Sequence, residues 1–267
     1  MKKILNLFKS KPTVPVIRLN GVIGGGSRFG GPGLNDAAMA TVIERAFTKG
    51  KPKAVALVIN SPGGSPTQSA LIAARIRRLA DEKDIKVYAF CEDVAASGGY
   101  WLATAADEVF VDSNSIIGSI GVISASFGFH EAMSRQGVER RVYTAGEDKS
   151  MLDPFRPENP EDIKRIKALQ KVIHDNFIEQ VTSRRGARLS KENLFTGEIW
   201  VGEQAVDKGL VDGVAHLIPK MKELFGDDVR LPVHGQKKSL LSRFGAPAAA
   251  SVIGDVEDRL YWSRFGL

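Results

Sequence analysis

Three polar loops, each following a predicted strand, carry the residues of this chain that could perform chemistry. The first, 60–64, reads Asn-Ser-Pro-Gly-Gly, the second, 95–101, places Ser97 at the start of a predicted helix, and the third, 144–150, carries Lys149. Adjacent glycines let backbone N–H groups approach a ligand, and a helix N-terminus favours negative charge. Together the loops offer a serine nucleophile, a base and donors for an oxyanion.

Lysine is the best candidate for the base that such a serine needs. Taken singly, each loop has an ordinary explanation, as an N-cap, a solvated lysine or a glycine turn. The four histidines lie outside the loops, and Ser97 lacks the Gly-x-Ser-x-Gly signature of α/β-hydrolases. Lysine acts as a base where its pKa is lowered toward neutrality, and Ser–Lys pairs are a known variant of the triad. Lys149 is therefore the predicted base.

Alternating strands and helices would position these loops. Such alternation predicts an α/β fold with a parallel sheet, whose loops meet at the carboxyl edge of the strands. Residues at helical spacing between 163 and 177 also predict a core-facing stripe, namely Ile163, Ile166, Leu169, Ile173 and Phe177. The predicted strands are 14–19, 54–59, 86–91, 108–111, 121–125 and 141–144, and the predicted helices are 35–49, 67–82, 97–106 and 160–184.

Composition excludes several classes of protein. The chain has 267 residues, of which 43% are apolar and 25% charged, which is typical of a globular protein and not of a disordered, collagen-like or disulfide-rich chain. The net charge of +6 is spread along the sequence, so no nucleic-acid partner is expected. Cys91 is the only cysteine, which excludes an intramolecular disulfide, and no cluster has the spacing of metal ligands. We expect no cofactor and no metal.

The two ends differ in character from the middle of the chain. We predict a basic and apolar segment at 1–12, a core at 13–232, and a linker with a helical tail at 233–267, the helix covering about 252–265. No stretch reaches the roughly 18–20 apolar residues of a membrane span, and the N-terminus is no clear signal peptide. We expect a cytoplasmic protein, with peripheral membrane contact through its ends as an option. Apolar tail residues are expected to dock on the core or, less favoured, on a partner subunit: Leu260, Tyr261, Trp262 and Phe265.

The motifs together resemble those of the signal peptide peptidase A (protease IV) family of Ser–Lys peptidases. The resemblance runs from about Val14 to Asp212, and the 52 residues between Ser97 and Lys149 are similar to the interval in short members. It rests on Ile-Asn-Ser-Pro-Gly-Gly at 59–64, Val-Ala-Ala-Ser-Gly-Gly-Tyr-Trp at 94–101, Gly-Ser-Ile-Gly-Val at 118–122, Gly-Glu-Asp-Lys-Ser at 146–150, and Gly-Glu-Ile-Trp-Val-Gly-Glu-Gln-Ala at 197–205 with Lys-Gly-Leu-Val-Asp at 208–212.

The resemblance implies a fold like those of crotonase and Clp protease, with stacked βαβ units in a single core domain followed by the helical tail. It implies that Ser97 is the nucleophile, Lys149 the general base, and Ser119 a residue that orients Lys149. It also implies a homo-oligomeric ring that cleaves signal-peptide remnants or other unfolded, apolar peptides. The implied oxyanion donors are the N–H of Gly98 and that of Gly64 or Gly63. The tentative substrate pocket comprises Tyr100, Trp101, Ile116, Ile117 and Met151.

Two other functions stay open at this point. A crotonase-like acyl-CoA enzyme would use the same oxyanion donors with a carboxylate such as Glu92 or Asp93 in place of the serine. A catalytically silent, ring-forming protein that binds peptides would tolerate replacement of Ser97 and Lys149. Most members of the family carry an N-terminal membrane anchor, which we do not expect in this sequence.

Overall fold

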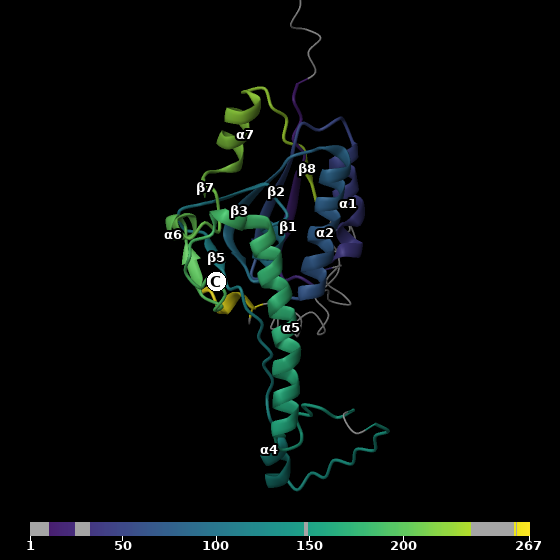
Figure 1. Cartoon of the computed structure of the whole chain (residues 1–267). Coiled ribbons are helices and arrows are strands. Elements are labelled where there is room, and N and C mark those ends of the chain that lie inside the picture. Colours follow the sequence, from purple (N-terminus) through teal and green to yellow (C-terminus); the bar gives the residue numbers. More distant parts are fainter. Residues whose placement is uncertain (1–10, 25–32, 147–148, 236–258, 260) are drawn as a thin grey trace, which may run out of the picture. The chain divides into compact units, whose positions relative to one another are not determined.

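The computed structural model describes residues 11–24, 33–146, 149–235, 259 and 261–267 (Figure 1). The chain divides into two compact units, one formed by Met1–Ile120 with Ile178–Leu267 and the other by Gly121–Phe177. Most of the predicted N-terminal segment, the glycine-rich stretch 25–32 and residues 252–258 of the helix predicted at 252–265 lie outside the described residues, as does Leu260. No helix in the described part of the chain is long and apolar enough to cross a membrane.

A mostly parallel sheet forms the centre of the first unit, as predicted for an α/β fold. Its strands run in the order β6-β5-β3-β2-β1-β8, while β4 pairs with β3 and β7. Only the pairing of β5 with β6 is antiparallel. The strands are β1 (Val16–Asn20), β2 (Val55–Ser61), β3 (Val87–Ala96), β4 (Glu108–Val111), β5 (Ile116–Gly118), β6 (Ile199–Val201), β7 (Gly213–Val214) and β8 (Val233–His234).

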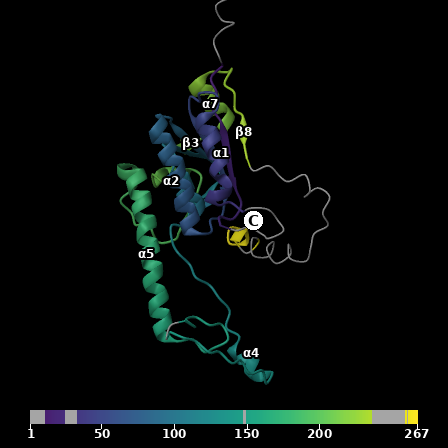
Figure 2. The same ribbon diagram turned by 90° about the vertical axis from the view of Figure 1, so that its right-hand side faces the viewer.

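Helices cover both faces of this sheet. Helices α1 and α2 lie side by side against one face (Figures 1 and 2), and Met221 of α7 packs with Val16, Val58 and Phe90 on the other. The side chain of Asn35 caps α1 by accepting the N–H of Ala38 at 2.9 Å. The helices of this unit are α1 (Asp36–Thr48), α2 (Pro66–Lys83), α3 (Gly98–Ala103), η2 (Gly186–Arg188), α6 (Glu203–Asp207) and α7 (Leu217–Phe225), with the end of α5 (Pro160–Arg185).

The long strand β3 has two different neighbours on one side. Its first half pairs with β4, and its last residues, 94–96, pair with β5. The predicted strand ended at Cys91 because Glu92 and Asp93 interrupt the apolar run. Both carboxylates are held by side chains of other strands, Glu92 by Arg18 of β1 at 3.4 Å and Asp93 by the amide of Asn60 of β2 at 2.6 Å. The strand therefore continues through its polar residues to Ala96, and Ser97 follows at the carboxyl edge of the sheet.

A buried ion pair fixes the end of α5 within the first unit. Arg185 lies 2.7 Å from Asp212 and is only 3% exposed. Burial alone would raise the pKa of Asp212, but the hydrogen bonds from Arg185 and the N–H of Val109 outweigh it, so the pKa is lowered. The carboxylate thus stays charged and joins α5 to β4.

The second unit, Gly121–Phe177, contains α4 (His130–Arg135) and the first part of α5. The predicted strands at 121–125 and 141–144 are wrong, because among residues 121–146 and 149–177 no strand is present to pair with them. Tyr143 is 89% exposed. The stripe on α5 is buried at Phe177, but Leu169 is 51% exposed, so the prediction that this residue faces the core is also wrong.

Candidate active site

Ser97 occupies a strained turn between β3 and α3. Its φ of +52° and ψ of −123° lie where L-residues with a side chain are rare. Such a conformation costs about 1–3 kcal/mol and clusters at functional sites. The N–H of Ser97 donates to the carbonyl of Gly118 at 2.8 Å, so pairing with β5 holds the turn in place. The shape is that of a strand-to-helix elbow that presents a serine side chain.

The loop after β2 lies directly against this elbow. Gly63 has a φ of +105°, and a Cβ there would lie 2.8 Å from the Cβ of Ser97 and 3.0 Å from the nitrogen of Gly98. A Cβ on Gly99 would lie 2.4 Å from the carbonyl oxygen of Ser61. Only glycines allow so close an approach. The structure therefore brings the first two predicted loops together.

Two backbone donors in these loops have no partner in the part of the chain that the structure describes. The N–H of Gly63 donates to the Oγ of Ser61 at 3.2 Å. By contrast, none of the hydrogen bonds found among the described residues uses the N–H of Gly64 or of Gly98. Gly98 is the first residue of α3, where an N–H has no partner within the helix. Gly64 and Gly98 thus match the requirements for donors to an oxyanion.

Ser119 follows β5 next to the elbow. The register pairs Ala96 with Gly118, so Ser119 follows Gly118 just as Ser97 follows Ala96. Ser119 has a φ of +51°, is 8% exposed, and donates its N–H to the carbonyl of Glu198 at 2.7 Å. Two serines with positive φ therefore end neighbouring strands at the same edge.

The residues predicted for a substrate pocket lie in several environments. Tyr100 is fully buried, and its hydroxyl donates to the carbonyl of Leu210 at 2.7 Å, so it belongs to the core. Trp101 and Ile117 are also buried, whereas Ile116 is half-buried. A substrate pocket would have to form mainly from residues other than Tyr100.

Neither a cysteine nor a metal centre competes with Ser97 in the described structure. Burial raises the pKa of the Cys91 thiol to about 12, so this thiol stays protonated at neutral pH and is a poor nucleophile. Among the described residues, no group of three or more histidine, cysteine, aspartate or glutamate side chains could hold a metal ion.

Lys149 lies in the second unit, on an exposed turn that is tied to the start of α5. Its N–H donates to the carbonyl of Gly146 at 3.3 Å. Just beyond it, Arg156 donates to the Oγ of Ser150 at 2.9 Å, and the N–H of Leu152 donates to Asp162 of α5 at 3.1 Å. These bonds give the segment after Lys149 a defined path.

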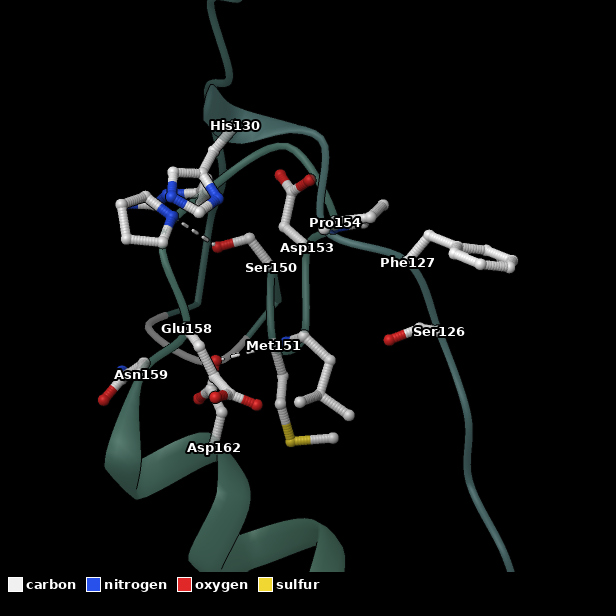
Figure 3. A pocket seen from close by; sticks show the side chains of 14 residues that line it. Ser126, Phe127, His130, Ser150, Met151, Asp153, Pro154, Glu158, Asn159 and Asp162 are labelled. Carbon is white, nitrogen blue, oxygen red and sulfur yellow. Dashed lines mark hydrogen bonds between the residues drawn. The ribbon is translucent and has the colours of Figure 1, made fainter. Parts of the chain in front are cut away.

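A cavity of about 540 Å³ opens beside this segment, within the second unit (Figure 3). Met151, one of the predicted pocket residues, lines it together with Phe127 and His130, and its wall also carries Asp153, Glu158 and Asp162. The lining is thus mixed, with apolar and acidic side chains around one opening.

Comparison with known proteins identifies the family. The model of peptidase family S49 matches residues 80–224, which is more than half of the chain and includes Ser97, Ser119 and Lys149. The chain belongs to peptidase family S49. Within this family it is of the signal peptide peptidase A type.

Three relatives show which named proteins this chain is similar to. A Brucella melitensis protein named Na(+)/H(+) antiporter NhaA is 46% identical over 271 residues, which cover 95% of this chain and 37% of that protein. The chloroplastic serine protease SPPA of Arabidopsis thaliana is 31% identical over 81% of this chain and 32% of its own length. The probable protease SohB of Haemophilus influenzae is 32% identical over 74% and 56%, respectively. The chain therefore spans only a third to somewhat over half of these relatives.

One residue of this candidate site was not singled out in the sequence analysis. Ser61 lies in the Asn-Ser-Pro-Gly-Gly motif, yet only the structure shows that its hydroxyl binds the Gly63 N–H. The signal in the sequence that could have indicated Ser61 was its position at the end of a predicted buried strand, shortly before two adjacent glycines.

Proposed function

We propose that this chain is a serine endopeptidase in which Ser97 is the nucleophile and Lys149 the general base. Its substrates would be signal-peptide remnants or other unfolded, apolar peptides. The observation that carries the proposal is the strained elbow at Ser97, which packs against Gly63 and is accompanied by two backbone N–H groups that have no partner among the described residues. Membership of family S49 supports the same chemistry.

Hydrolysis would proceed through an acyl-enzyme. The Oγ of Ser97 attacks the scissile carbonyl carbon while the Lys149 amine takes the hydroxyl proton. The N–H groups of Gly64 and Gly98 bind the oxyanion of the tetrahedral intermediate. Collapse breaks the C–N bond, and Lys149 returns the proton to the leaving amine. Lys149 then activates a water that hydrolyses the ester, and Ser119 would orient Lys149 by a hydrogen bond.

Gly64 is the better donor of the two glycines in the first loop. The N–H of Gly63 is already engaged by Ser61, whereas the N–H of Gly64 has no partner among the described residues. An oxyanion is bound most strongly by donors that need not first break another bond. We therefore assign the oxyanion hole to Gly64 and Gly98.

A ring of identical subunits is part of the proposal. The second unit exposes large apolar side chains, including Phe127 at 76%, Tyr143 at 89% and Val172 at 59%. Apolar surface of this kind is typical of protein–protein interfaces. The cytoplasmic location and the peripheral membrane contact stay predictions.

Peptide hydrolysis is favoured over the other functions considered. The antiporter name belongs to whole Brucella proteins of which this chain matches 37%, whereas the S49 model covers residues 80–224 of this chain directly. For a crotonase-like enzyme, Glu92 and Asp93 would be the candidate bases, but they already bind Arg18 and Asn60.

Cleavage of an unfolded, apolar peptide with a quenched fluorophore tests the proposal. The wild type and the control Lys83→Ala, which removes a lysine from the last turn of α2, should cleave the peptide. Ser97→Ala and Lys149→Ala should each lose about 10³-fold or more of the rate. Cleavage by either variant at the wild-type rate would contradict the dyad, and a silent wild type would favour the peptide-binding alternative.

A further inference from the structure

Ser61 is a buried hydroxyl that the proposed chemistry does not use. It is the last residue of β2 and is 0% exposed. Its Oγ donates to the carbonyl of Gly21, beyond β1, at 2.7 Å and accepts the N–H of Gly63 at 3.2 Å. A hydroxyl has a single proton, so its donor is fully committed to Gly21 while one acceptor site serves the glycine turn.

Hydrogen bonds with Ile23 hold the backbone on both sides of Gly64. The N–H of Ile23 donates to the carbonyl of Gly63 at 2.8 Å, and the N–H of Ser65 donates to the carbonyl of Ile23 at 2.8 Å. A Cβ on Gly64 would lie 2.1 Å from that Ile23 oxygen, so the two segments are in close contact. With the Gly63 N–H held by Ser61, the Gly64 N–H is the donor of this turn that has no partner within the described part of the chain.

We propose that Ser61 is a positioning residue for the oxyanion hole, and this inference rests on the proposed function. Its hydroxyl takes the N–H of Gly63 out of use and fixes the plane of the next peptide, so that the N–H of Gly64 keeps one direction. Its carbonyl oxygen lies against Gly99, beside the second donor at Gly98. One serine thereby contacts both loops that supply the oxyanion donors.

Loss of this hydroxyl should slow the chemical step and spare binding. In Ser61→Ala, the buried N–H of Gly63 and the carbonyl of Gly21 both lose a partner, and the turn can rotate to regain one. Removing an oxyanion donor outright costs about 10²–10³-fold in kcat, and a donor that is present but misdirected costs less. We expect a fall of about 10- to 100-fold.

Inactivation by a fluorophosphonate, followed by intact mass, measures this effect without a known substrate. The phosphoryl oxygen of the probe occupies the oxyanion hole, so the limiting rate kinact reports on the donors, whereas KI reports on binding. The matched control is Ser115→Ala, because the Ser115 hydroxyl is also buried, donates to the Cys91 carbonyl at 3.1 Å and accepts the Asp112 N–H at 2.9 Å. Ser61→Cys, which keeps the volume with a weaker donor and acceptor, serves if Ser61→Ala does not fold.

The outcomes separate this inference from the proposed function. A kinact that falls in Ser61→Ala or Ser61→Cys, with KI unchanged and with Ser115→Ala at the wild-type value, supports the positioning role. A labelled wild type with an unchanged kinact in the Ser61 variants overturns this inference and leaves the peptidase standing. An equal loss in Ser115→Ala also overturns it, because the effect would then follow from general destabilisation. An unlabelled wild type overturns the proposed function and this inference with it.

Discussion

Replacing Gly63 by alanine should disable the Ser97 elbow through a single added methyl group. Two costs arise in the folded protein. A φ of +105° is unfavourable for alanine by about 1–2 kcal/mol, and the new Cβ would lie 2.8 Å from the Cβ of Ser97. Relieving such overpacking typically costs about 1–3 kcal/mol more. We therefore expect Gly63→Ala to lower the free energy of unfolding by about 2–5 kcal/mol.

Gly50→Ala separates the two costs. Gly50 also has a positive φ, +78°, but a Cβ there meets nothing within 4 Å, so only the backbone cost of about 1–2 kcal/mol should appear. Urea unfolding measures both variants, and fluorophosphonate labelling measures the serine. Gly50→Ala should label at the wild-type rate, and Gly63→Ala at least about tenfold more slowly, since the methyl group displaces Ser97. Equal stability losses, or normal labelling of Gly63→Ala, would refute the reasoning.

Three further results are expected. Arg185→Ala removes the buried partner of Asp212 and leaves its carboxylate with the Val109 N–H and the more exposed Arg188 at 3.1 Å, so it should cost up to about 3–5 kcal/mol in urea unfolding. A loss below about 1 kcal/mol would contradict the role of the Arg185–Asp212 pair. The backbone N–H of Asn114 and then the His216 ring hold the pKa of Asp112 at about 2, below its usual 3.8, so this group stabilises the fold above about pH 4 and the contribution disappears as the pH falls toward 2. Urea unfolding at several pH values measures this contribution, and the free energy of unfolding of Asp112→Asn should lack this part of the pH dependence between about pH 5 and 2.5. A variant whose free energy of unfolding follows the wild-type pH profile would contradict the role of Asp112. Ser119→Ala should lower the labelling rate by about tenfold while the unfolding curve stays in place, and a wild-type rate would remove Ser119 from the site.

The strand at 54–59 was predicted well because its environment is almost entirely apolar. Residues 54–59 form a continuous apolar run, and β2 is buried along nearly all of its length. The extension of β3 could not be predicted, because Glu92 and Asp93 are accommodated only by side chains from two other strands. The run at 141–144 has β-forming residues but no partner strand among the described residues, and a strand needs one.

Part of the candidate site could be predicted from the sequence. Loops that follow parallel strands meet at one edge, so the approach of Gly63 to Ser97 follows from topology. The choice between Gly63 and Gly64 does not, because it depends on where the Ser61 hydroxyl points. Tyr100 was misleading, since its place in α3 directs its ring into the core and its hydroxyl to Leu210.

The most direct test of the central claim is the site of covalent labelling. Purified wild-type protein is treated with a fluorophosphonate, weighed intact, digested and mapped. The account predicts the mass of a single probe on Ser97 and no adduct in Ser97→Ala. A folded wild type that takes up no probe, or carries it on another serine, would contradict the assignment of Ser97 as the nucleophile.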